Sequence, residues 1–176
     1  MNIILLGYRG AGKSVVSKLL ARQLHRKLYS LDAIIEEEVG LPIPEIVSMW
    51  GWARFREIEA KIVEQVTGEA QNAVIDCGGG VILNPVNVNR LKADGKVVLL
   101  TAEFETLLSR LKRDRNTRPP LTEGLTWEEE HRKVLAERED QYRAAANLVC
   151  DTTTKRPDET VDDIIRYFKQ QSWVEA

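Results

Sequence analysis

The sequence predicts an α/β fold, a three-layer α/β/α sandwich around a central parallel sheet of about five strands. One observation behind this prediction is that short, continuously apolar runs alternate along the chain with longer segments of helical period. Strands that are covered on both faces of a parallel sheet have this continuous apolar character. The other is that the first apolar run, "NIILL", ends in a glycine-rich turn that leads into a helical segment. A chain of 176 residues has room for one well-buried core, so we expect residues 1–176 to form a single domain.

The strands and helices follow from local patterns. Strands are expected at the apolar, β-rich runs of residues 3–6, 27–32, 73–77, 96–101 and 147–151. Helices are expected where apolar residues recur at helical spacing, at residues 14–24, 52–67, 103–112, 127–146 and 157–170. The last helix opens with a proline in its first turn and two acidic residues, which suit the positive end of a helix dipole.

Two stretches do not fit the core elements. Residues 32–50 are interrupted by one glycine and two prolines, and residues 112–124 are polar. In an open α/β sheet such interruptions fall beyond the carboxyl ends of the strands, where ligands bind. We therefore expect an acceptor-binding insertion at about residues 32–60 and a mobile lid at about residues 112–124.

Composition and charge argue against several classes of partner. The formal net charge is -2, with 43% hydrophobic and 30% charged residues, so no basic excess points to nucleic acid or to an anionic membrane. No stretch approaches the roughly 20 apolar residues of a membrane span, and the N-terminus lacks the basic flank of a signal peptide.

Cys77 and Cys150 are expected to be small buried residues in a reducing compartment. His25 and His131 have no partner near in sequence, so neither is expected to be catalytic. We expect a cytoplasmic monomer that binds small molecules.

The segment "GYRGAGKS" at residues 7–14 matches the pattern GxxxxGK[ST], with a strand before it and a helix after it. Glycines allow backbone N–H groups to point inward at phosphate oxygens, while Lys13 is placed to reach the β and γ phosphates and Ser14 to hold magnesium. The nucleotide-binding residues expected from this loop are Gly10, Ala11, Gly12, Lys13, Ser14 and Val15. The alternative is a tight strand-to-helix turn with an incidental Lys-Ser pair.

A P-loop in a chain of this length belongs to a small-molecule kinase or to a switch GTPase. The kinase is favoured because the sequence has no guanine-reading NKxD segment. The run "DCGGG" from Asp76 fits the DxxG pattern of a GTPase by letter, so a nucleotide-binding switch stays open as an alternative. Four arginines, Arg110, Arg113, Arg115 and Arg118, crowd a loop that ends in "RPP". Such a loop is typical of a mobile cationic cover over a transferring phosphate.

A second group of residues points to a phosphoryl acceptor. Asp32 is expected at the end of the second strand, and Arg56 and Glu59 share one face of the next helix. A carboxylate and a guanidinium beside the P-loop suit an acceptor with a hydroxyl and an acid group, which Arg56 would grip bidentately. Surface salt bridges are the alternative. The consecutive glycines Gly78–Gly80 expose backbone N–H groups and leave room for a ligand to lie against the chain.

An ordered set of motifs runs through nearly the whole chain. The motifs are the P-loop at Gly7–Ser14, "LDAIIEEEVG" around Asp32, "FREIE" from Phe55, the glycines Gly78–Gly80, "RPPL" from Arg118, "EREDQY" around Arg138 and "DTTTKRP" before the last helix. Together they resemble the shikimate kinase family. The resemblance implies a P-loop fold of the nucleoside-monophosphate-kinase type. It also implies transfer of the ATP γ-phosphoryl group to the 3-hydroxyl of shikimate, giving shikimate 3-phosphate on the route to chorismate and aromatic amino acids.

The resemblance implies a role for each acceptor residue. Asp32 contacts the acceptor hydroxyl and is the candidate for taking its proton. Arg56 and Arg138 bind the shikimate carboxylate, and the backbone of Gly78–Gly80 completes the pocket.

On the donor side, the resemblance implies that ATP and Mg²⁺ bind at the P-loop, with Lys13 as a catalytic residue. Arg118 is a further catalytic residue, which reaches the phosphates from the lid when the lid closes. The residues implied around adenine are Arg110, Lys155, Arg156 and Pro157. This scheme suits phosphoryl transfer, in which positioning and charge neutralisation supply most of the rate.

Two positions depart from the family pattern. The family usually has Asp-x-Asp at the end of the second strand, with its first carboxylate helping to hold magnesium through water, and Ser30 stands there. Asp76 stands where the family usually has a small neutral residue, at the end of "VID", which fits the Walker B pattern. We hypothesise that Ser14 and Asp76 hold the magnesium. In the alternative, Ser30 carries a water and Asp76 caps a turn. A kinase for another small polyol acid, such as gluconate, also stays open.

Overall fold

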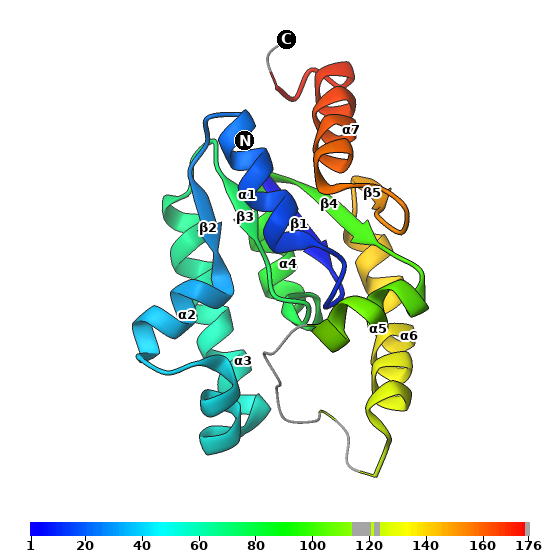
Figure 1. Ribbon diagram of the computed structural model, residues 1–176. Helices are drawn as coiled ribbons and strands as arrows, with labels where there is room; N and C mark the ends of the chain where they lie inside the picture. The colour runs from blue at the N-terminus through cyan, green and yellow to red at the C-terminus, as the bar shows by residue number, and fades with distance from the viewer. Residues whose placement is uncertain (114–120, 122–123, 175–176) are drawn as a thin grey trace.

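The computed structural model describes residues 1–113, 121 and 124–174, and the strands among them form one parallel sheet. The strands are β1 (Asn2–Gly7), β2 (Leu28–Ser30), β3 (Val74–Asp76), β4 (Gly95–Thr101) and β5 (Leu148–Asp151). Their order across the sheet is β2-β3-β1-β4-β5. Because β1 is central and all strands run the same way, the loops after β3, β1 and β4 meet at one edge (Figure 1).

Helices cover both faces of this sheet. They are α1 (Lys13–Gln23), α2 (Leu31–Val39), α3 (Ile43–Glu69), α4 (Pro85–Ala93), α5 (Phe104–Arg113), α6 (Trp127–Ala145) and α7 (Pro157–Gln170), with a short 3-10 helix η1 (Val81–Leu83). In Figure 1, α1 and α7 lie in front of the sheet and pack against each other, while α3, α4 and α6 lie behind it. These layers confirm the predicted three-layer α/β/α fold class.

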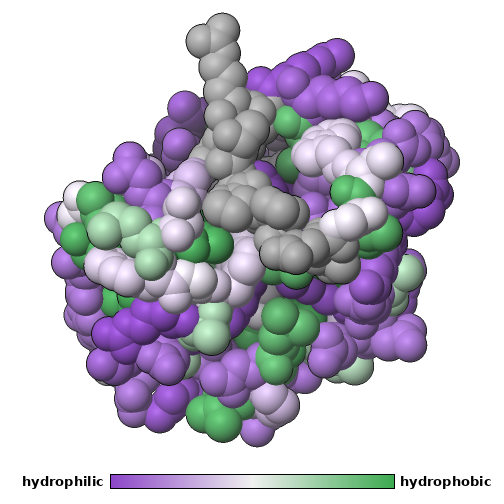
Figure 2. All heavy atoms as spheres, turned by 90° about the horizontal axis from the view of Figure 1, so that it is seen from below, coloured by the Kyte–Doolittle hydropathy of each residue, from purple (hydrophilic) through white to green (hydrophobic). Residues whose placement is uncertain are grey.

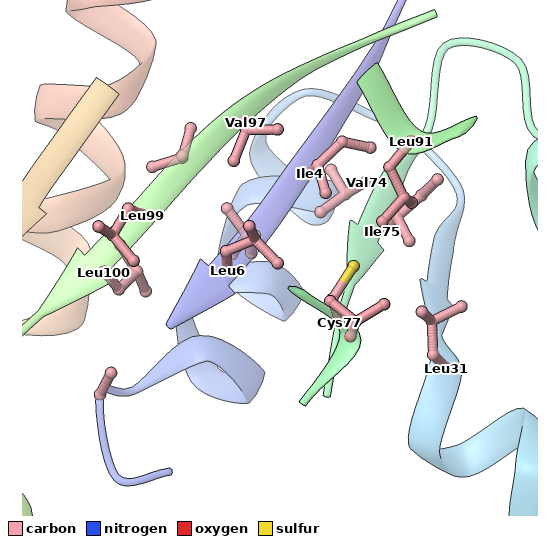
Figure 3. Packing of buried hydrophobic residues seen from close by; sticks show 14 of the residues in the cluster. Ile4, Leu6, Leu31, Val74, Ile75, Cys77, Leu91, Val97, Leu99 and Leu100 are labelled. Atoms are coloured by element: carbon pink, nitrogen blue, oxygen red, sulfur yellow. The ribbon is translucent and has the colours of Figure 1, made fainter. Parts of the chain in front are cut away.

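The core is built on the central strands. Ile3, Ile4 and Leu5 of β1 are fully buried, and so are Val74 and Ile75 of β3. Figure 3 shows side chains of β1, β3 and β4 packed together at the centre of the sheet. Full burial of such an aliphatic side chain contributes about 1.5–3 kcal/mol, so the apolar runs that predict the strands also stabilise the sheet.

The sequence predicts no helix within residues 32–50, and this is wrong because α2 and the first part of α3 occupy them. Gly40 ends α2 with a φ of 74°, while Pro42 is the N-cap of α3 and Pro44 lies in its first turn. Glycine after a helix and proline at its start delimit helices without breaking them. Asp32 lies in the first turn of α2 and not at the end of β2, which ends at Ser30.

Two further features of the helices differ from expectation. Gly51 has φ 79° and ψ 168° inside α3, so the helix is kinked there and the predicted helix from Trp52 is its second part. The helix α4 is not predicted, although its start has a readable signal. The Asn84 side chain accepts a hydrogen bond from the backbone N–H of Val86 at 3.0 Å, and Pro85 takes the first helical position.

The remaining predicted elements agree with the structure to within a few residues. Cys77 and Cys150 are buried and free, as expected. No helix in the described ranges has the length and apolar character needed to cross a membrane. Of the predicted lid, residues 114–120, 122 and 123 lie outside the described residues.

Candidate active site

The loop between β1 and α1 has the geometry of a phosphate nest. Gly10 and Gly12 have φ values of 82° and 95°, in the left-handed region that glycine tolerates best. A Cβ atom on Gly10 would lie 3.0 Å from the carbonyl oxygen of Leu107, so glycine also lets the loop pack closely on α5. The Lys13 ammonium donates to the carbonyls of Gly7 at 2.8 Å and Tyr8 at 3.1 Å.

A cavity, here called the P-loop pocket, opens at this loop. It brings together most of the predicted donor residues with part of the predicted acceptor and metal sets. Its lining includes Gly10, Gly12, Lys13, Ser14, Val15, Ser30, Asp32, Asp76, Gly78, Gly79 and Arg110. Ala11, also predicted, is 1% exposed and packs into the core.

Asp76 is the last residue of β3, and the sheet register pairs it with Ser30 of β2. Register partners in a parallel sheet point to the same face, so the two side chains stand at one level on neighbouring strands. The Asp76 side chain is buried and accepts a hydrogen bond from the Ser17 hydroxyl at 3.4 Å. Burial raises the pKa of Asp76, partly offset by the nearby Lys13 ammonium and a hydrogen bond from Ser14.

A second cavity, here called the arginine pocket, adjoins the first. It contains the two arginines predicted to bind an acid, together with the triple glycine and several aromatic rings. Its lining includes Tyr8, Trp52, Phe55, Arg56, Gly78, Gly79, Gly80, Trp127, His131 and Arg138. Gly78 and Gly79 line both cavities, so the two pockets are contiguous. Figure 2 looks onto the end of the molecule toward which the strands lead, where hydrophilic residues predominate.

Arg56 is held in place by a buried ion pair. Its Nη1 donates to Glu59 Oε2 at 2.7 Å, and Glu59 is 1% exposed. Its guanidinium also lies 5.4 Å from the ring centre of Trp52 and 5.1 Å from that of Phe55, within the range of cation–π contacts. The pair is therefore not a surface salt bridge.

The triple glycine brings these side chains close to the backbone. A Cβ atom on Gly80 would lie 2.1 Å from Arg56 Nη2, and one on Gly78 would lie 2.9 Å from Asp32 Oδ1. The carbonyl of Gly79 accepts hydrogen bonds from the Tyr142 hydroxyl and, at 3.4 Å, from Arg138 Nη1. The space beside these glycines, which the sequence predicts to be open for a ligand, is therefore occupied by protein side chains.

Thr152, which follows β5, connects the P-loop to the end of β4. Its buried hydroxyl lies 3.0 Å from the carbonyls of both Ala11 and Thr101 and accepts from Arg110 Nη1 at 3.0 Å. Arg110 also donates to the carbonyl of Gly10 at 3.1 Å. The sequence shows "DTTT" but gives no sign of which threonine makes these bonds.

Comparison with known proteins agrees with this geometry. The family described as Shikimate kinase matches residues 9–169. The chain belongs to the shikimate kinase family. A shikimate kinase of Syntrophus aciditrophicus is 38% identical, with 97% of this chain and 92% of that protein covered. One of Lactococcus lactis subsp. lactis is 40% identical over 93% of this chain and 96% of that protein.

Solved structures of the shikimate kinase family share the fold. Shikimate kinase from Acinetobacter baumannii in complex with shikimate superposes with a TM-score of 0.89 at 31% identity, covering 97% of this chain and 93% of that chain. Shikimate kinase from Aquifex aeolicus superposes with a TM-score of 0.80 at 30% identity, covering 99% and 100%.

Some residues predicted from the family resemblance lie elsewhere or are not described. Arg118 lies outside the described residues. Lys155, Arg156 and Pro157 precede or begin α7 and are not among the residues that line the two pockets. Lys155 donates to Asp163 at 2.6 Å. Their proposed contact with adenine stays a prediction.

We expect Gly80→Ala to weaken binding of the phosphoryl acceptor. The new methyl group displaces the guanidinium of Arg56, the flexible end of a long side chain, so the fold is retained. Because a hydrogen bond to a charged group contributes about 1.5–3 kcal/mol, the acceptor KM should rise at least about tenfold. Gly68→Ala is the control, because a Cβ atom there meets nothing within 4 Å. An unchanged acceptor KM in Gly80→Ala would contradict the role given to Arg56.

We expect Thr152→Val to act on the nucleotide side instead. The variant keeps the side-chain shape but removes the hydroxyl that joins Arg110 to the P-loop, so the KM for ATP should rise about two- to tenfold. Steady-state kinetics with each substrate varied in turn measure this effect. Thr153→Val is the matched control, because the Thr153 hydroxyl bonds the backbone N–H of Glu103 at 2.9 Å. Equal ATP KM values for both variants would count against the assignment.

Proposed function

We propose that the protein transfers the γ-phosphoryl group of ATP to the 3-hydroxyl of shikimate. The observation that carries this proposal is the contiguity of the two pockets through Gly78 and Gly79. A phosphate nest and a pair of arginines for an acid group thus share one wall. The names of the relatives support the choice of shikimate, and one solved relative holds shikimate itself.

The acceptor side supplies positive charge for the carboxylate of shikimate and a hydrogen-bond acceptor for its hydroxyl. Arg56 and Arg138 bind the carboxylate, where planar guanidinium groups give bidentate contacts. Asp32, which lines the P-loop pocket beside Gly78, orients the hydroxyl and accepts its proton as the new bond to phosphorus forms. Positioning of this kind supplies much of the rate in phosphoryl transfer.

The donor side is prepared for a phosphate chain. Lys13 donates to two backbone carbonyls, which are neutral acceptors. An anionic phosphate oxygen forms a stronger, charge-assisted hydrogen bond, so bound ATP draws the ammonium to its β and γ phosphates. We further propose that Arg118, on a lid at residues 112–124, adds positive charge when the lid closes.

Magnesium fits the oxygen atoms at the P-loop. The described residues contain no cluster of three or more His, Cys, Asp or Glu side chains able to hold a metal by themselves. Mg²⁺ at kinase sites is usually bound by one or two carboxylates together with substrate phosphates and water. The Ser14 hydroxyl lies near the Asp76 carboxylate, whose pKa it lowers, and these two groups would hold the ion. Bound there, Mg²⁺ neutralises charge on the phosphates.

Two other functions remain as outcomes of the test. A kinase for a flexible polyol acid such as gluconate has little use for Asp32, Arg56, Arg138 and the triple glycine together. A nucleotide switch has no need of the arginine pocket. We also propose that the enzyme acts as a cytoplasmic monomer.

The proposal is tested by coupled ADP release with shikimate, quinate, gluconate and nucleoside monophosphates as acceptors. We expect ADP release that depends on shikimate and is abolished in Lys13→Ala. Turnover with gluconate but not shikimate would make the protein a different kinase. Slow hydrolysis without any acceptor, with GTP preferred to ATP, would identify a switch.

Asp76→Asn is expected to raise the Mg²⁺ concentration for half-maximal activity at least about tenfold, as changes at metal sites commonly do. The amide keeps the shape and can still accept from Ser17, so folding is retained. Ser30→Ala is the matched variant on the neighbouring strand and should change this concentration little. A larger increase of this concentration in Ser30→Ala than in Asp76→Asn would favour the alternative in which Ser30 carries a water that contacts the ion.

The same Asp76→Asn variant should stabilise the protein when EDTA removes metal. Burial raises the pKa of Asp76 above its ordinary value of 3.8. At neutral pH the ionised carboxylate therefore costs more free energy in the folded chain than in the unfolded chain. The variant should therefore have the higher Tm at pH 7. The difference should shrink as the pH falls through the raised pKa toward 3.8. A Tm difference independent of pH would contradict this cause.

A further inference from the structure

Tyr8 is a P-loop residue whose side chain does not face the phosphate site. It is 5% exposed, and its hydroxyl lies 2.7 Å from Nδ1 of His131 in α6. The two rings meet edge to face, with centroids 5.8 Å apart. Phosphate binding by a P-loop uses backbone N–H groups, a lysine and a hydroxyl, so nothing in that chemistry accounts for a tyrosine bonded to α6.

Trp127 extends this contact to the start of α6. Its ring meets that of His131 edge to face at 4.6 Å. Tyr8, His131 and Trp127 therefore form a column of three rings, here called the ring column, and all three line the arginine pocket. Such aromatic pairs contribute about 0.5–1.5 kcal/mol beyond the area that they bury.

The inner face of α6 is thus fastened at two places. His131, Arg138 and Tyr142 are spaced so that they share one helix face, and all three are buried. In the second half of the helix, Arg138 and Tyr142 donate to the carbonyl of Gly79. Near its start, His131 bonds to Tyr8. Because Arg138 belongs to one fastening and shares a helix face with the other, both determine where its guanidinium stands in the pocket.

The protonation states of Tyr8 and His131 follow from the surroundings of the two side chains. Burial lowers the pKa of His131, and the nearby Arg9 guanidinium lowers it further. Burial also raises the pKa of Tyr8. Tyr8 therefore keeps its proton at neutral pH, and the imidazole of His131 is neutral, so the contact is a hydrogen bond between two uncharged groups.

We propose that His131 and Tyr8 are positioning residues for the phosphoryl acceptor. Their hydrogen bond holds the first half of α6 against the P-loop, so that Trp127 and Arg138 face the acceptor at a fixed distance from the donor phosphates. This inference rests on the proposed function and goes beyond it, because it assigns to two residues in the wall of the acceptor pocket the role of holding α6 there.

The test compares Tyr8→Phe, His131→Phe and the double variant by steady-state kinetics. Tyr8→Phe removes one oxygen and His131→Phe keeps a ring in the column. Each should raise the KM for shikimate about three- to tenfold, the range expected for one hydrogen bond, with the KM for ATP nearly unchanged. The double variant should be no worse than either single one, because both remove the same bond.

Tyr167→Phe is the control, because the Tyr167 hydroxyl belongs to α7, lines neither pocket and bonds the carbonyl of Asn147 at 3.5 Å. Tm values for all variants show whether each remains folded at the assay temperature. A wild-type KM for shikimate in Tyr8→Phe, or additive effects in the double variant, would overturn this inference alone. Absence of shikimate turnover by the wild-type chain would overturn the proposed function and this inference with it.

Discussion

The pairing of β3 with β1 is the constraint on which the rest of the site depends. Parallel neighbours end at the same edge of the sheet, so the P-loop after β1 and the triple glycine after β3 are adjacent. The approach is close, since a Cβ atom on Gly79 would lie 3.4 Å from the carbonyl oxygen of Gly7. Side chains from three different helices then gather around this junction. Asp32 comes from α2, Arg56 from α3 and Arg138 from α6.

The site concentrates positive charge within a chain whose formal net charge is -2. Lys13 and Arg110 donate to backbone carbonyls of the P-loop, while Arg56 is paired with the buried Glu59. The carboxylate of Glu59 holds Arg56 in place. Lys13 and Arg110 therefore stand at the loop that would bind phosphates, and Arg56 is fixed where an acid group would arrive. Preorganised charge of this kind is a large component of catalysis in sites that exclude water.

The sequence was most informative where local chemistry alone determines structure. The P-loop, the apolar strands and the helix that opens at Pro157 are each specified by neighbouring residues. Asp32 and residues 32–50 were placed less well, because glycine and proline interrupt the pattern there and both can delimit helices as well as loops. Some contacts of the site could not be predicted from local sequence patterns at all. The bonds of Tyr8 to His131 and of Thr152 to Ala11 span 123 and 141 residues, and no periodicity reports such distant partners.

The register between β2 and β3 has a consequence for how related chains are compared. Ser30 and Asp76 are separated by more than forty residues of sequence but stand side by side at one level of the sheet. A survey that scores position 30 alone would count this chain as having lost an acidic group. A survey that scores the spatial neighbourhood would find one on the adjoining strand. Inventories of acidic ligands across such enzymes are therefore better drawn up by strand register than by alignment column.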